Sequence, residues 1–155
     1  MKKIFISFIL LFITNFTFSQ ENLIPKDQLV KLKQVYKWND EKILLVNFYL
    51  PKKNCHYNQY QNLIKGKKWF NDNIYKNINL SNIKKIFVYS DKFEAKDIID
   101  NNSFFVDFEN YFLNNFFDVN NNCYGIIAIN SNGKHSFKIG EFLTEDVVSI
   151  LTNVN

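Results

Sequence analysis

The run KILLVNFYL at residues 42–50 constrains the fold more than any other part of this 155-residue chain. It is almost continuously apolar, it is rich in β-branched and aromatic side chains, and Pro51 follows it. Such a run is typical of a strand that is buried on both faces of a parallel or mixed sheet. Residues 83–90 and 124–130 are also predicted to be core strands. The chain is therefore expected to form a sheet with both faces covered.

Apolar residues recur at helical spacing between these strands. Helices are expected over residues 25–38, 55–78 with a break or kink at Gly66, 93–99, 108–116 and from 144 onward. Thr144 is expected to cap the last helix, which would bury Val147, Val148, Ile150 and Leu151. The turn at Ser131-Asn132-Gly133 predicts a hairpin to a strand at 135–140, and 104–107 is a minor strand. This order predicts an α/β fold with a mixed central sheet and helices on both faces.

The first nineteen residues have the pattern of a signal peptide. Two lysines precede an apolar stretch, and Thr17 and Ser19 provide small residues before the expected cleavage site. The apolar stretch has about 15 residues, whereas a membrane span needs roughly 20. An uncleaved anchor is the alternative. We therefore expect a signal peptide at 1–19, and one exported domain at 20–155 that is periplasmic or secreted and has no stable membrane span after cleavage.

Charge and composition exclude several classes of partner. The formal net charge of +4 includes both lysines of the leader, which leaves too little positive charge for a nucleic-acid-binding surface. All basic residues are Lys, and the abundance of Asn, Ile and Phe fits an AT-rich, bacterial genome. The chain has no phosphate loop, catalytic serine signature or metalloprotease motif. We expect a monomer with no cofactor, no metal and no nucleic-acid partner.

Three segments resemble the thioredoxin-like superfamily, particularly its exported thiol–disulfide oxidoreductases and peroxiredoxin-like relatives. LLVNFYLPKKNCHYN at 44–58 is similar to the family's strand, active-site loop and cysteine at a helix start. IFVYSD at 86–91 is similar to the next core strand, and 124–141 is similar to the hairpin that closes the sheet. The resemblance covers most of residues 40–152. It implies a thioredoxin-like fold.

The motif that carries redox activity in this family is degenerate here. Redox-active members have Cys-x-x-Cys, whereas this chain has Cys55-His56-Tyr57-Asn58. Tyr124 stands where the family places its cis-proline, or an arginine in peroxiredoxins. In the peroxiredoxin alignment, Asn58 falls where the peroxide-reactive cysteine belongs. A standard peroxidase activity is therefore not expected.

The candidate catalytic residues are the two cysteines. A cysteine at a helix start has a lowered pKa, so Cys55 is the expected attacking thiol. The resemblance places Cys123 opposite that helix start, which makes it the expected resolving or disulfide partner. Tyr124, His56 and Asn58 are the candidate substrate-binding residues. The expected function is thiol–disulfide exchange with protein or small-molecule thiols and disulfides.

Several alternatives stay open. A Cys55–Cys123 bridge could be a static staple that contributes roughly 3–5 kcal/mol. The domain could instead be a non-catalytic binding or folding-accessory module, with Tyr124 and the loop 51–58 shaping a peptide-contact surface. A metal site is disfavoured because His135 is expected on the surface at the opposite end of the sheet. Asp91, at the end of a core strand, is expected to be a helix cap rather than a catalytic acid.

Overall fold

The fold is that of a computed structural model. The structure describes residues 23–50, 60–93, 95–117 and 123–155, with the backbone alone for 60–62. Its helices and strands are α2 (Lys26–Val35), β1 (Ile43–Tyr49), α3 (Tyr60–Asn73), β2 (Ile83–Tyr89), β3 (Phe104–Val106), the 3-10 turn η2 (Phe108–Asn110), α4 (Tyr111–Phe116), β4 (Tyr124–Asn130), β5 (His135–Ile139) and α5 (Thr144–Val154). No helix within these described ranges is long and apolar enough to cross a membrane. The predicted signal peptide lies outside the described residues.

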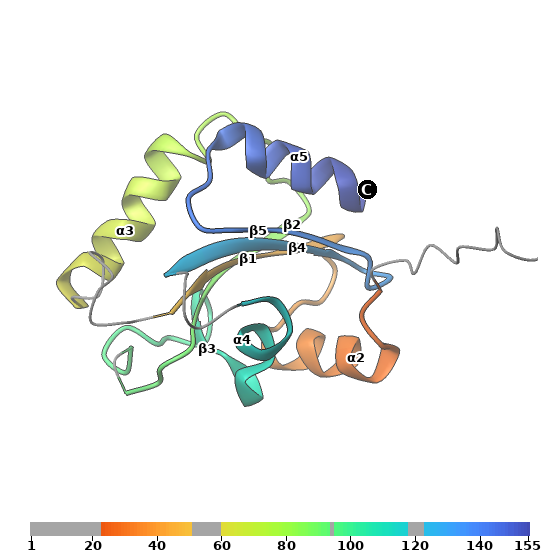
Figure 1. The fold of residues 1–155 in the computed structure, drawn as a ribbon, viewed down its shortest axis with the longest axis horizontal. Helices are drawn as coiled ribbons and strands as arrows, with labels where there is room; N and C mark the ends of the chain where they lie inside the picture. Colours follow the sequence, from red (N-terminus) through yellow and green to blue (C-terminus); the bar gives the residue numbers. More distant parts are fainter. Residues whose placement is uncertain (1–22, 51–59, 94, 118–122) are drawn as a thin grey trace, which may run out of the picture.

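The five strands form one mixed sheet in the order β3-β2-β1-β4-β5 (Figure 1). β1 is parallel to β2 and antiparallel to β4, β2 is parallel to β3, and β4 and β5 form an antiparallel hairpin. At the end of β1, Tyr49 pairs with Tyr89 on one side and with Tyr124 on the other. The predicted α/β architecture with a mixed sheet is confirmed.

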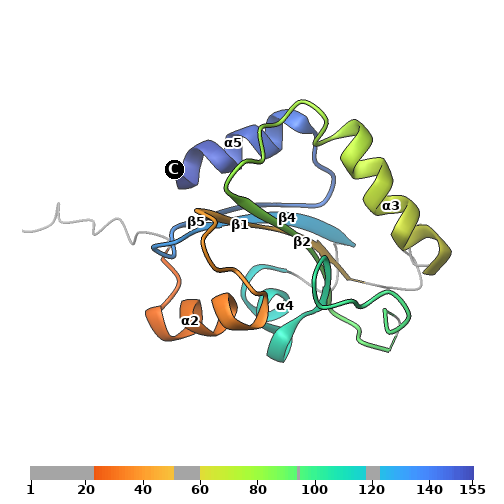
Figure 2. The ribbon, with the colours of Figure 1, turned by 180° about the vertical axis from the view of Figure 1, so that it is seen from behind.

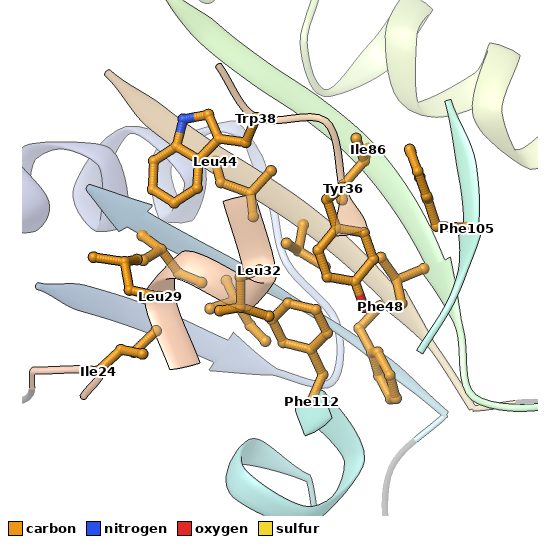
Figure 3. Packing of buried hydrophobic residues seen from close by; sticks show 14 of the residues in the cluster. Ile24, Leu29, Leu32, Tyr36, Trp38, Leu44, Phe48, Ile86, Phe105 and Phe112 are labelled. Atoms are coloured by element: carbon orange, nitrogen blue, oxygen red, sulfur yellow. The ribbon is translucent and has the colours of Figure 1, made fainter. Parts of the chain in front are cut away.

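Helices cover both faces of this sheet. α3 and α5 lie over one face, and α2 and α4 lie over the other (Figures 1 and 2). Side chains alternate along β1, so Ile43 and Leu45 join the core under α3 and α5. Leu44, Val46 and Phe48 join the core on the α2 side (Figure 3). Burial on both faces explains why the run from 42 to 50 is almost entirely apolar.

Asn47 is the polar exception within β1 and is 1% exposed. Its Nδ2 donates to the carbonyl oxygen of Ile86 at 3.1 Å. Its Oδ1 accepts a hydrogen bond from the hydroxyl of Tyr75. Burial raises the pKa of Tyr75, so this hydroxyl keeps its proton. The strand therefore tolerates a buried amide because both ends of that amide are paired.

The structure corrects the predicted helix boundaries in the middle of the chain. α3 continues through Gly66 to Asn73, so the predicted break is wrong. A glycine costs a helix interior only about 1 kcal/mol, which the flanking turns offset. Ile78 lies beyond the end of α3 in a turn. The described part of 93–99 forms hydrogen-bonded turns and no helix, beginning where Ala95 N–H donates to the carbonyl of Asp91.

The start of the last helix also differs from the prediction. Leu143, not Thr144, is the N-cap of α5, and the N–H of Leu143 donates to Asp146 Oδ2 at 2.8 Å. Thr144 instead donates its hydroxyl to the carbonyl of Ile74 at 3.1 Å, which ties α5 to the end of α3. Val148 was expected inside but is 48% exposed, because α5 buries the stripe that includes Val147 and Ile150.

The predicted hairpin joins β4 to β5. Gly133 has φ +93°, a conformation that side-chain-bearing residues rarely adopt. A Cβ there would also lie 2.8 Å from the carbonyl oxygen of Ile24. The close approach allows Ile24 N–H to donate a hydrogen bond to the carbonyl of Gly133 at 2.9 Å. The turn thus fixes where the N-terminal segment joins the sheet.

Candidate functional site

Cys123 lies at the edge of the sheet where β1 ends. Its carbonyl oxygen accepts a hydrogen bond from Leu50 N–H at 2.8 Å, which extends the ladder one residue beyond Tyr49 and Tyr124. β1 has a parallel neighbour on one side and an antiparallel neighbour on the other, and ligands of α/β folds often bind beyond the carboxyl ends of such strands. Cys123 is disulfide-bonded rather than a free thiol.

Only part of the predicted site falls within the described chain. Cys123 and Tyr124 are described. Cys55, His56 and Asn58 belong to the stretch between Leu50 and Tyr60, which lies outside the described residues. The pairing of Cys55 with Cys123 therefore stays a prediction, as do the roles of His56 and Asn58.

A pocket opens on the α3 and α5 face of the sheet, with Tyr124 in its lining, and we call it the aromatic pocket. It encloses about 240 Å³ and is lined by residues from the end of β1, the start of β4, α3 and the segment between β5 and α5. Among the described residues, the aromatic side chains that line it are Tyr49, Trp69, Phe70, Tyr124 and Phe142. Cys123 precedes Tyr124 in the chain but is not among the described residues that line the pocket.

The aromatic rings of the pocket pack against one another. Tyr49 and Tyr124 are stacked with ring centroids 6.2 Å apart, and Phe70 and Phe142 are stacked at 5.3 Å. Trp69 meets the edge of Phe70 at 5.2 Å. Phe70 and Phe142 are buried, whereas Trp69 is 54% exposed. The pocket therefore has a fixed aromatic floor and an accessible apolar rim.

Gly66 explains how the pocket stays open. It lines the pocket from within α3, and a Cβ built on it would meet no atom of the described residues within 4 Å. Neither a tight turn nor a close neighbour requires glycine at this position. The sequence signal for the pocket was therefore available, because Gly66 stands one helical turn from Trp69 in an amphipathic helix. The sequence reasoning missed the pocket because it interpreted that glycine as a helix break.

The remaining predicted residues lie away from the pocket or have structural partners. Asp91 Oδ1 accepts a hydrogen bond from Phe93 N–H at 2.8 Å, which caps a turn and not a helix. His135 begins β5 and pairs with Ile129, at the other end of the hairpin from Cys123. The side chain of His135 is partly buried, and its ring meets the edge of Phe116 with centroids 5.2 Å apart. Burial lowers the pKa of His135.

Asp107 is a buried carboxylate that sequence reasoning did not single out. It is 4% exposed. Its two carboxylate oxygens accept hydrogen bonds from the backbone N–H groups of Phe112 at 3.0 Å and Leu113 at 2.9 Å. Burial raises the pKa of Asp107 to about 6, although these hydrogen bonds oppose the shift. Asp107 anchors the start of α4 and lies on the face opposite the aromatic pocket.

The described ranges contain no group of three or more His, Cys, Asp or Glu side chains that could hold a metal ion. Comparison of the chain with protein-family models, with curated proteins and with solved structures gives no match. Its function is therefore inferred from the edge around Cys123 and the pocket beside it.

Proposed function

We propose that this chain is an exported thioredoxin-like protein that exchanges a Cys55–Cys123 disulfide with substrate thiols. The observation that carries the proposal is the position of Cys123, which is disulfide-bonded at the edge where β1 ends. The chain has only two cysteines, so Cys55 is the sole partner within the same chain. A disulfide also suits an exported protein, because oxidising compartments preserve such bonds.

Chain length supports this pairing. Cys55 follows Leu50 by five residues, and five residues span at most about 17 Å when fully extended. Leu50 is already hydrogen-bonded to Cys123. The Cα atoms of a disulfide lie about 4.4–6.8 Å apart, well within that reach. A bridge between Cys55 and Cys123 therefore requires no rearrangement of β1 or β4.

The proposed exchange is balanced in atoms and electrons. A thiolate of a dithiol substrate attacks one sulfur of the Cys55–Cys123 bond, forms a mixed disulfide and releases the other cysteine as a thiolate. The second substrate thiolate attacks the mixed disulfide, so the substrate leaves as a disulfide and both protein cysteines end as thiols. Two electrons pass from the substrate to the protein. The reverse sequence reduces a substrate disulfide.

Cys55 is the proposed attacking residue of the reduced form. Lys52 and Lys53 are its neighbours in the sequence, and positive charge lowers the pKa of a cysteine. A lower pKa increases the thiolate fraction near neutral pH, which speeds attack on a disulfide. Cys123 then resolves the mixed disulfide.

The test compares insulin reduction by the reduced wild type, Cys55→Ser and Cys123→Ser. We expect both variants to lose activity, with Cys55→Ser retaining only the background rate. Cys123→Ser should accumulate a mixed disulfide that is visible by mass, because no second thiol resolves it. Wild-type activity equal to that of Cys55→Ser would show that the disulfide is not an exchange site.

A second candidate function is favoured by a separate observation, the aromatic pocket. A non-catalytic binding or folding-accessory module would use Tyr124 and the pocket to hold a ligand, with the disulfide as a staple. The reactivity of the reduced Cys55 with iodoacetamide as a function of pH separates the two. A pKa near 8.5, the value of a free thiol, together with no insulin reduction, favours the binding module.

A further inference from the structure

We propose that the aromatic pocket binds one planar aromatic ring, either neutral or carrying a positive charge. This goes beyond thiol–disulfide exchange and does not depend on it. The ring could belong to a small molecule or to an aromatic side chain of a peptide. Both sources present the same chemistry to the pocket, and the test below distinguishes them.

The volume of the pocket sets the size of its ligand. An apolar cavity of about 150 Å³ takes benzene, whereas pockets for drug-sized ligands begin at about 300 Å³. The aromatic pocket, with about 240 Å³, lies between these limits. Its volume suits one benzene or indole ring.

The lining chemistry selects an aromatic ligand. Tyr49, Phe70, Tyr124 and Phe142 form the stacked floor described above. Aromatic pairs are favourable in offset-stacked or edge-to-face arrangements, so a planar ring gains such contacts on entering. Trp69 and Leu143, which are 54% and 64% exposed, lie at the rim. A bound ring would remove this apolar surface from water.

Gly66 keeps the pocket accessible. A Cβ at this position of α3 would meet no atom of the described residues within 4 Å. No described neighbour therefore requires a glycine at position 66. Glycine is instead a cost to the helix. A large residue at position 66 should therefore close the pocket without displacing any existing contact.

Glu141 determines the preferred charge of the ligand. It is exposed, and it is the one charged residue among the described residues that line the pocket. Two lysines of α3 are engaged elsewhere: Lys67 lies over the ring of Phe104 at 4.5 Å, and Lys68 pairs with Asp72 at 2.6 Å. An amine on the ligand is therefore favoured, and a carboxylate is disfavoured.

The test titrates the oxidised protein with indole, tryptamine and indole-3-acetate and follows the two tryptophan side-chain N–H signals by NMR. Trp69 lines the pocket and should shift. Trp38 is buried against the other face, where its Nε1 donates to the carbonyl of Glu41, so its signal is an internal reference. We expect indole to bind with a Kd of about 0.1–5 mM. No shift of Trp69 at about 10 mM indole overturns the proposal.

The variants separate the ring site from unspecific binding. Gly66→Leu should weaken indole binding at least about tenfold, and Lys65→Leu, an exposed control on the same helix outside the pocket lining, should change it less than about twofold. Gly66→Ala, which fills little volume, checks that substitution at position 66 leaves α3 folded. Equal indole affinity in wild type and a folded Gly66→Leu variant overturns the proposal.

Charge and source are resolved in the same titration. Tryptamine should bind about 2–5-fold more tightly than indole and indole-3-acetate more weakly, and Glu141→Gln should remove that difference. The source is tested with a capped tripeptide that has a central tryptophan. If this peptide binds at least as tightly as indole, the ring that the pocket binds is assigned to a peptide side chain. A peptide that binds about tenfold more weakly assigns a small molecule. Indole binding that persists in wild type when reduced wild type shows no more insulin reduction than Cys55→Ser removes the redox proposal and supports this one.

Discussion

At the scale of single residues, the core depends on a few buried polar groups that have specific partners. Asn47 lies inside the central strand and is paired at both ends, through Ile86 and Tyr75. Asp107 is buried at the start of α4 and accepts two backbone hydrogen bonds. The free-energy cost of leaving Asn47 unpaired, and that of ionising Asp107, can both be measured.

Removing the hydroxyl of Tyr75 should destabilise the fold. Tyr75→Phe leaves Asn47 Oδ1 buried without its donor, and such an orphan costs about 1–3 kcal/mol. Urea unfolding of Tyr75→Phe, Asn47→Leu and the double variant measures the effect. We expect a coupling energy of about 0.5–3 kcal/mol between the two positions. Strictly additive losses would show that the hydroxyl and the amide do not stabilise each other.

Asp107 should make stability depend on pH in the direction opposite to a salt-bridged carboxylate. Its pKa is about 6 in the folded protein and lies near 3.8 when unfolded, so folding favours the protonated form. The stability that it contributes is present below about pH 4 and is lost as pH rises through 6. Between pH 4 and 7, the unfolding free energy of Asp107→Asn should therefore gain about 2–3 kcal/mol relative to wild type. A difference that stays flat over this range would contradict the shift.

At the scale of elements, α3 has two roles. It covers one face of the sheet through Phe70, and it leaves the aromatic pocket open at Gly66. Glycine lowers the stability of a helix, and here no turn or contact demands it.

Gly66→Ala should stabilise the protein by about 0.5–1 kcal/mol, because alanine favours the helix and its Cβ meets open space. The matched control is Gly125→Ala in β4. A Cβ at position 125 would lie 2.7 Å from the carbonyl oxygen of Lys138 and 2.9 Å from the ring of Phe117, so this variant should be destabilised. Thermal unfolding distinguishes the two. A Gly66→Ala variant less stable than wild type would contradict the open geometry.

Strands were easier to predict than helices and pockets. Burial on both faces requires an unbroken apolar run, so β1, β2 and β4 were evident in the sequence. The helical spacing around Gly66 was ambiguous, because glycine can either end a helix or lie within one. The spacing after Phe93 was also ambiguous, and in both segments tertiary packing decides the outcome. Gly66 beside Trp69 was a sequence signal for one wall of the aromatic pocket, but the pocket as a whole could not be predicted, since Tyr49, Phe70 and Phe142 meet only after the sheet forms.

At the scale of the whole molecule, the sheet brings the two ends of the proposed site together. β1 and β4 are neighbours in space although residues 50–123 separate them in sequence. The proposed Cys55–Cys123 bond would close a loop of about 70 residues between them, and such a closure contributes about 4 kcal/mol in the chain-entropy account.

Reduction should therefore lower the unfolding free energy by about 2–4 kcal/mol without unfolding the domain, because each face of the sheet has its own buried apolar cluster. Urea unfolding with and without a phosphine reductant gives this value. The double variant Cys55→Ser/Cys123→Ser should match the reduced wild type and should not respond to the reductant. Unfolding on reduction would indicate a structural staple.

The most direct test of thiol–disulfide exchange is a redox titration of the protein in glutathione and dithiothreitol buffers, with alkylation and intact mass as the readout. We predict that both thiols appear together in one two-electron step, at a potential more oxidising than about −300 mV, and that the oxidised protein yields one linked peptide pair containing Cys55 and Cys123. Two alkylated cysteines before any reductant is added would contradict the proposed exchange. A disulfide with a reduction potential more negative than about −300 mV would contradict it as well.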